Sequence, residues 1–247
     1  MRSSIIAAGF TLTLLLGRAG AEPPDRVAAL LRAVEAAVQP ATALRADGEL
    51  TVASPEQTLS YPLILLSRPG RHASELYFEL GHNGGKALVL EGGARSLRLA
   101  AGASRPEPFP ADAAWAGSEF SREDLQPFRA AAFGDVRISD ESATRITLAL
   151  VPKASQYCLL VMTIDLERKV PLKILYYRGT LNNLVKMQRD GDHARIAGSW
   201  RPRTVTMEDF KLRTQSTLRL RWTENPDFSP AVFEPAALAQ SSGLRWP

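Results

Sequence analysis

The residue types that usually carry catalysis are scarce in this chain of 247 residues. The three histidines, His72, His82 and His193, each lie in a predicted turn, and none has the i, i+4 partner of a helical metal site. The single cysteine, Cys158, can form neither a cysteine-rich zinc site nor an internal disulfide. From these side chains we expect no metal site and no cofactor.

One group of acidic residues has the composition of an acid–base pair. Glu119, Glu123 and Asp124 lie close together in the sequence, so two of them could act as general acid and general base. The first turn of a helix capped by Ser121 explains the same pattern, because carboxylates stabilise a helix N-terminus. No G-x-S-x-G motif or phosphate-binding loop accompanies them. We expect a protein that is not an enzyme and keep a secreted hydrolase using Glu123 or Asp124 as a third hypothesis.

The elements that would position any site are mostly β-strands. The second half of the chain consists of apolar runs separated by turns rich in Gly, Asp and Asn, a pattern typical of strands joined by hairpins. We predict an antiparallel meander with strands at Tyr157–Ile164, Val170–Tyr177, Leu184–Gln188, Ile196–Met207 and Thr214–Trp222. In the first of these, residues of both parities are apolar, which indicates that both faces are covered or that one face lines an apolar cavity.

The first half of the chain adds a helix and further strands. Apolar residues at near-helical spacing predict a helix over Asp25–Val38, which Pro40 ends. Strand patterns occupy 47–101, where Pro62 indicates an edge or a bulge, and resume at Val136–Ser139 and Arg145–Val151.

A long insert, 102–133, separates these two sets of strands. It contains the aromatic residues Trp115, Phe120, Phe128 and Phe133. Short helices are predicted at Ala111–Trp115, where a turn is the alternative, and after Ser121. An insert of this length is either a fixed helical plug over the sheet or a movable lid.

The first 21 residues have the features of a secretory signal peptide: a positive Arg2, the apolar run Ile5–Leu16 and small residues at Ala19–Ala21. No cysteine follows, so a lipid anchor is not expected. We predict a single domain over residues 22–247, outside the cytoplasm. The formal net charge of +4 falls to +2 without Arg2 and Arg18, which is too weak to indicate nucleic-acid binding.

Several short motifs follow one another from about Trp115 to Leu220. They are Gly117–Leu125 with the sequence GSEFSREDL, Tyr157-x7-Asp165, Val170-Pro171-Leu172-Lys173-Ile174, Lys186-Met187, Gly198-x-Trp200-x-Pro202 and Met207-Glu208-Asp209. In order and spacing they resemble the LolA-like family of outer-membrane lipoprotein-sorting proteins, whose segment reads GSxFSxEDL. One departure is Lys211-Leu212-Arg213-Thr214, where the family usually has a Gly before the last strand.

The resemblance implies a mainly β fold with a few α-helices: a half-open, curved antiparallel β-barrel of about eleven strands with helices over its mouth. It also implies a periplasmic carrier that binds the acyl chains of a lipoprotein or lipid in a hydrophobic cavity and shuttles it toward the outer membrane. An inner-membrane transporter as donor and an outer-membrane acceptor would be its partners. We expect a monomer with no nucleic-acid partner.

The contacts to such a ligand would come from the insert and from one face of the meander. We predict the following cavity and lid residues: Trp115, Phe120, Leu125, Phe128, Leu160, Met162, Ile174 and Tyr176. The alternative function is a non-enzymatic interaction module that docks on an envelope transporter or assembly complex. That module would have a filled interior and an exposed apolar patch.

Overall fold

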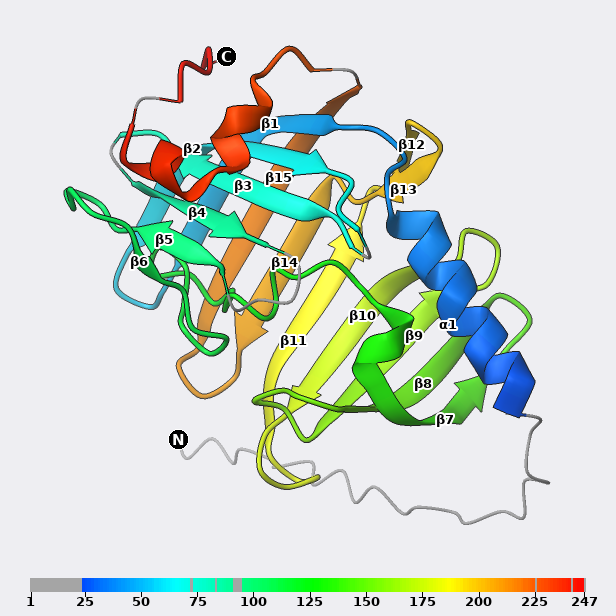
Figure 1. The fold of residues 1–247 in the computed structure, drawn as a ribbon. Helices are drawn as coiled ribbons and strands as arrows, with labels where there is room; N and C mark the ends of the chain where they lie inside the picture. Colours follow the sequence, from blue (N-terminus) through cyan, green and yellow to red (C-terminus); the bar gives the residue numbers. More distant parts are fainter. Residues whose placement is uncertain are drawn as a thin grey trace, which may run out of the picture.

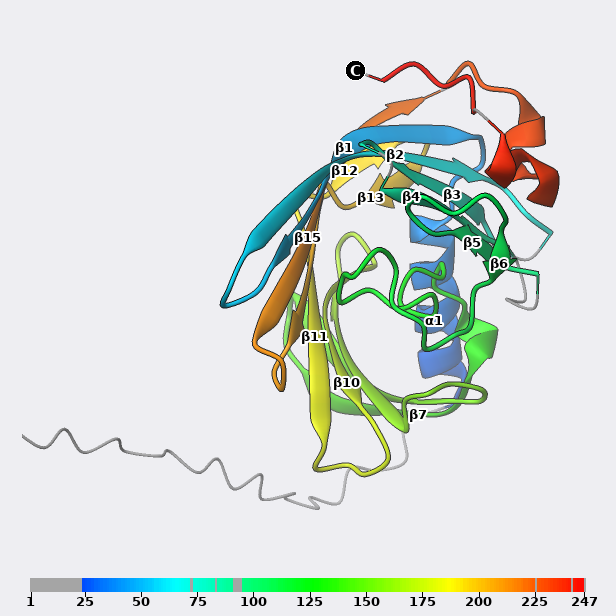
Figure 2. The same cartoon turned by 90° about the vertical axis from the view of Figure 1, so that its left-hand side faces the viewer.

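A single curved antiparallel sheet dominates the structure, a computed structural model that describes residues 24–71, 73–82, 84–90, 95–224, 226–240 and 242–246 (Figure 1). The predicted signal peptide lies outside these ranges. Within them the sheet has thirteen strands in the order β6-β5-β4-β3-β2-β1-β15-β14-β11-β10-β9-β8-β7. It curves strongly without closing, which confirms the expected half-open barrel (Figure 2).

Most strands pair with their neighbours in chain order, but β1 pairs with the last strand, β15, and β11 pairs with β14. The consecutive strands β6 and β7 form the two edges of the sheet. Their bounds are β1 Leu44–Ala53, β2 Thr58–Arg68, β3 Glu75–Leu80, β4 Gly85–Val89, β5 Leu97–Leu99, β6 Glu107–Pro108, β7 Phe133–Glu141, β8 Arg145–Pro152, β9 Leu159–Asp165, β10 Val170–Tyr177, β11 Leu184–Gly191, β12 Ala194–Ile196, β13 Ser199–Arg201, β14 Thr204–Asp209 and β15 Thr214–Glu224. Pro62 lies in β2 beside the end of β3, where its carbonyl accepts the Gly81 N–H. The predicted edge or bulge is wrong, because β2 lies between β1 and β3 and its pairing with β1 runs through Pro62 without a register shift. Pro62 is tolerated because the ladder with β3 ends at Leu63.

The continuous strand predicted over Ile196–Met207 is wrong. Ala197 and Gly198 both have positive φ, 46° and 80°, and form the tight turn of the separate β12–β13 hairpin. Two central residues with positive φ are typical of a two-residue β-hairpin turn. The chain returns to the main sheet only at β14, after Pro202.

The concave face of the sheet is covered by α1, Pro24–Val38, and by the insert (Figure 2). Leu31 and Val34 are buried on one side of α1, which confirms the predicted amphipathic helix. A backbone N–H of η1, Ala130–Ala132, donates to Glu35 of α1 over 3.0 Å between Ala130 N and Oε2. The helix and the insert therefore form one cover.

The convex face of β2–β4 has a smaller cover at the end of the chain. Two 3₁₀ helices, η2 Pro230–Phe233 and η3 Pro235–Ala239, place Val232, Phe233 and Leu238 on this face. They pack against the sheet residues Ile64, Leu66, Tyr77, Leu88 and Leu90. Both faces of this half of the sheet are buried, which explains its continuous apolar runs.

Residues 111–115 of the insert form a turn, which was the predicted alternative to a short helix, and a bridge between Ala114 and Ser121. The helix predicted to start at Ser121 is wrong, because residues 122–125 form turns. Ser121 and Asp124 do form the reciprocal hydrogen bonds of a capped turn: Ser121 N donates to Oδ2 over 2.8 Å, and Asp124 N donates to Ser121 Oγ over 3.4 Å. Pro127 prevents this turn from continuing as a helix, because proline lacks an N–H and disfavours helical backbone in the preceding residue.

Candidate functional site

A cavity of about 320 Å³ lies between the concave face of the sheet and the insert. Its volume is at the lower end of the range of roughly 300–1,000 Å³ found for small-molecule sites. Most of its walls are apolar side chains, and its polar groups are concentrated at Tyr157, around the turn 123–124 and near β13. It is the natural candidate for a ligand site on this face.

One wall of the cavity comes from β9 and β10. Leu160 and Met162 face Tyr176 and Ile174 in register across the two strands, so all four side chains point to the same face. All four line the cavity. The face chosen from the sequence is therefore the concave one, and the opposite-parity residues such as Leu159 do not line the cavity.

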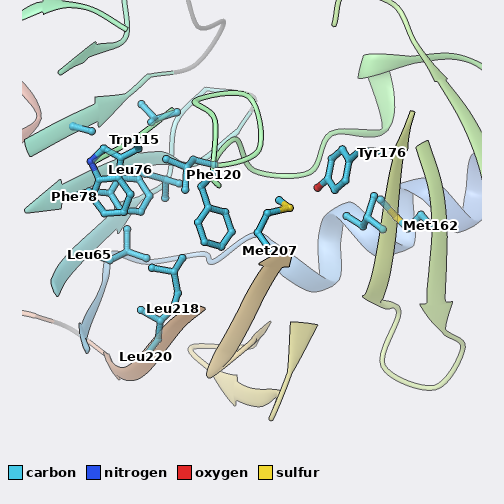
Figure 3. Close-up of a cluster of buried hydrophobic side chains, with 14 of the residues drawn as sticks. Leu65, Leu76, Phe78, Trp115, Phe120, Met162, Tyr176, Met207, Leu218 and Leu220 are labelled. Carbon is cyan, nitrogen blue, oxygen red and sulfur yellow. The ribbon is translucent and has the colours of Figure 1, made fainter. Parts of the chain in front are cut away.

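The facing wall comes from the other end of the curved sheet. It contains Leu65, Leu76, Phe78, Val205, Leu218 and Leu220. In Figure 3 most of these side chains gather on one side and Tyr176 and Met162 lie on the other, with Met207 between them. The strong curvature of the sheet brings the two groups to face one another.

The roof is the insert, and three of its four predicted residues line the cavity. Phe120, Leu125 and Phe128 do so, and Phe128 packs against Phe133 with ring centroids 5.6 Å apart. Trp115 does not line the cavity. It is 2 % exposed and packs on Phe78, with ring centroids 4.9 Å apart (Figure 3).

Polar side chains fasten this roof to the sheet. Asp124 Oδ1 accepts the Tyr157 hydroxyl over 2.8 Å, and Asp124 Oδ2 lies 3.3 Å from Lys186 Nζ of β11. Lys186 Nζ also donates to the carbonyl of Glu119 over 2.6 Å. On β15, Ser216 Oγ accepts the Glu119 N–H over 2.9 Å.

Glu119, Glu123 and Asp124, the acidic residues considered for hydrolysis, all accept hydrogen bonds that hold the insert in place. Glu123 accepts hydrogen bonds from the Ser155 hydroxyl and from the Gln156 N–H, and Glu119 accepts one from the Thr214 hydroxyl. Carboxylates held in this way act as anchors of the insert. Among the described residues, no group of three or more His, Cys, Asp or Glu side chains could hold a metal ion.

A hydrogen-bonded polar chain runs along one side of the cavity. The Tyr176 hydroxyl donates to Gln188 Oε1 over 2.7 Å, and Gln188 Nε2 donates to Asp190 Oδ1 over 2.7 Å. Burial raises the pKa of Asp190 to about 7, and the hydrogen bond from Gln188 opposes that rise. Asp190 is therefore a carboxyl group that titrates near neutral pH.

The polar end of the cavity is built by the β12–β13 hairpin and α1. Arg201 lies over the ring of Trp222, with 4.5 Å between Cζ and the ring centroid, and its Nη1 donates to the Val38 carbonyl over 2.8 Å. His193 and Trp200 line the same end, and burial lowers the pKa of His193. Sequence reasoning missed this end, although the Ala197-Gly198 pair was a signal for the hairpin that carries Trp200 and Arg201.

Comparison with models of protein families identifies the family of this chain. A family model described as "Uncharacterized protein" matches residues 104–240, which is more than half of the chain. The chain belongs to that family. No curated protein matches the sequence.

Solved structures show that the fold of the chain is LolA-like. An outer membrane lipoprotein-sorting protein domain from Vibrio parahaemolyticus superposes with a TM-score of 0.74 at 16% identity, covering 86% of this chain and 98% of that one. A DUF1329 family protein from Desulfovibrio piger gives 0.78 at 16% identity, covering 88% and 99%. A LolA superfamily protein from Nitrosomonas europaea gives 0.56 at 15% identity, covering 83% and 96%. At these identities the comparison establishes the LolA-like fold alone.

Proposed function

We propose that this protein is a non-enzymatic periplasmic carrier that binds an acyl chain of a lipoprotein or lipid and shuttles it toward the outer membrane. The observation that supports the proposal most is the cavity of about 320 Å³ between the apolar concave face and the aromatic roof. The LolA-like fold, shared with a domain described as lipoprotein-sorting, supports the same role. The predicted signal peptide accounts for a periplasmic location.

The physical requirement for such a carrier is modest. Each CH₂ group moved from water to an apolar site is stabilised by about 0.8 kcal/mol, so an apolar cavity binds an alkyl chain without any chemical step. The present volume suits one chain better than several. A larger cargo would require the roof to move, and the roof is attached to the sheet through side-chain contacts such as Lys186–Asp124.

The alternative role as a docking module is less well supported. That role requires a filled interior, whereas the concave face encloses a cavity. A hydrolase is also less well supported, because Glu123 and Asp124 are engaged in hydrogen bonds to the segment between β8 and β9. None of the helices in the described ranges is long and apolar enough to cross a membrane.

The direct test is to purify the protein from its native envelope, extract it with organic solvent and analyse the extract by mass spectrometry. The proposal predicts a copurifying lipid or acylated peptide, and it predicts that the delipidated protein takes up a labelled fatty acid. Recovery of no lipid, together with no uptake, would favour the docking module.

A further inference from the structure

We propose that the guanidinium group of Arg201 binds the anionic headgroup, a carboxylate or a phosphate, of an amphiphile whose alkyl chain lies against Leu160, Met162 and Ile174. This inference rests on the proposed carrier function and names the ligand class of the same cavity. Arg201 lies at the polar end of the cavity and the three apolar residues line its wall. The cavity therefore has the two-part character of an amphiphile.

The hydrogen bonds of Arg201 are incompletely satisfied within the described part of the chain. Its Nη1 donates to the Val38 carbonyl, but its buried Nε has no hydrogen-bond partner there. The guanidinium lies over Trp222, and a cation stacked on a ring keeps its N–H donors in its own plane. Those donors suit the two oxygens of a carboxylate or phosphate, which guanidinium groups bind in pairs of parallel hydrogen bonds.

The charge of Arg201 is also not matched. No ion pair is found for it among the described residues, although buried cations are normally paired. Burial lowers the pKa of Arg201 to about 10, which still leaves the group positive at neutral pH. An anionic ligand would supply the missing counter-charge.

Other charged groups line the same cavity, but none of them forms an ion pair with Arg201 among the described residues. Glu123 and Asp124 are held by hydrogen bonds at the roof, and Arg129 adds a second positive group to the lining. Asp190 also lines the cavity, and burial raises its pKa to about 7. Below that pH it is neutral and does not compete for Arg201.

Arg122 provides an instructive comparison. Its Nε and Nη1 are also buried without hydrogen-bond partners in the described residues, and burial also lowers its pKa. Arg122 does not line the cavity, however, whereas Arg201 does. Arg201 therefore combines an unsatisfied buried donor with a place in the cavity lining, a combination that Arg122 lacks.

The test uses the delipidated protein at pH 6 and three ligands of the same chain length: a fatty acid, its methyl ester and the matching alkyl phosphate. Affinities are measured by displacement of a neutral fluorescent ester. A hydrogen bond to a charged group contributes roughly 1.5–3 kcal/mol, so we expect one anion to bind at least about tenfold more tightly than the methyl ester. The tighter anion distinguishes a carboxylate from a phosphate headgroup.

Two variants complete the design. Arg201→Gln is expected to reduce the preference for the anion to about one while retaining binding of the methyl ester. Arg203→Gln, which removes an exposed cation two residues away, should keep the preference of the wild type. The preference of the wild type is itself a test that does not depend on the folding of any variant.

The outcomes separate the two proposals. If the ester and both anions bind the wild type equally, the headgroup site is wrong and the carrier stands. If Arg201→Gln keeps the anion preference, the headgroup site is also wrong. If none of the three ligands binds, the carrier proposal fails and the headgroup site fails with it.

Discussion

Lys186 and Asp124 form a buried ion pair, with 3.3 Å between Nζ and Oδ2, that joins β11 to the roof of the cavity. Their side chains are 11 % and 0 % exposed. Asp124 also accepts the Tyr157 hydroxyl and the Ser121 N–H, so one carboxylate connects the insert with β11 and with the segment before β9. The GSxFSxEDL-like segment thus acts as an anchor in this structure.

Removing the cation of this pair is expected to destabilise the protein. Lys186→Met leaves the Asp124 carboxylate buried without its counter-charge, and breaking a buried pair in this way costs about 3–5 kcal/mol. We expect a loss of roughly that size in the free energy of unfolding, measured by urea denaturation. Lys211→Met, at an exposed position, is the matched control and should change stability by no more than about 0.5 kcal/mol. Equal stability of the two variants would show that the pair does not hold the roof.

The stability of the protein should depend on the protonation of Asp190. Its pKa in the folded state, about 7, is above the ordinary value of 3.8, so the folded protein binds the proton more tightly than the unfolded chain. The resulting stabilisation is fully present below about pH 4 and is lost as the pH rises through 7. Its size is on the order of a few kcal/mol.

Asp190→Asn should remove this part of the pH dependence. The variant is expected to lose less stability than the wild type between pH 5 and pH 8, in urea denaturation at each pH. Asp192→Asn changes a nearby carboxyl group for which no comparable burial is found, and it serves as the control. Parallel pH profiles for wild type and Asp190→Asn would contradict the assignment.

Arg213 is a site where the chain departs from the resembling family and carries strain. Its φ is 55°, in the left-handed region that favours glycine, directly before β15. Arg213→Gly should raise the free energy of unfolding by roughly 0.5–1 kcal/mol, because relief of the strain exceeds the entropic cost of glycine. Arg213→Ala, which removes the side chain but keeps the strain, should bring no such gain when both variants are measured by urea denaturation.

The sequence predicts those parts of the fold that are local. Apolar runs and turn residues predict β9 and β10, and the choice of Leu160 and Met162 over Leu159 identifies the concave face. The pairing of β1 with β15 is not local, and no sequence pattern indicates it. This pairing places the first and last strands side by side in the middle of the sheet and so joins its two halves.

The apolar part of the candidate site could be predicted from the sequence, whereas its polar part depends on contacts between distant segments. Apolar wall and roof residues stand out by type, whereas Asp190 and Arg201 belong to short polar segments that look like exposed strand ends. Asp190 reaches the cavity from β11, and Arg201 reaches it from the β12–β13 hairpin beside the end of α1. Trp115 shows the opposite error, since its size suggested ligand contact but its ring fills the space beside Phe78.

The most direct test of the carrier account is uptake of a radiolabelled fatty acid by two variants of β9. Leu160→Trp fills the cavity from its wall, whereas Leu159→Trp makes the same substitution one residue away on the opposite face. With both variants folded by circular dichroism, the account predicts that Leu160→Trp loses most of the uptake and Leu159→Trp retains that of the wild type. Uptake that is equal in all three proteins, or absent from the wild type, would contradict it.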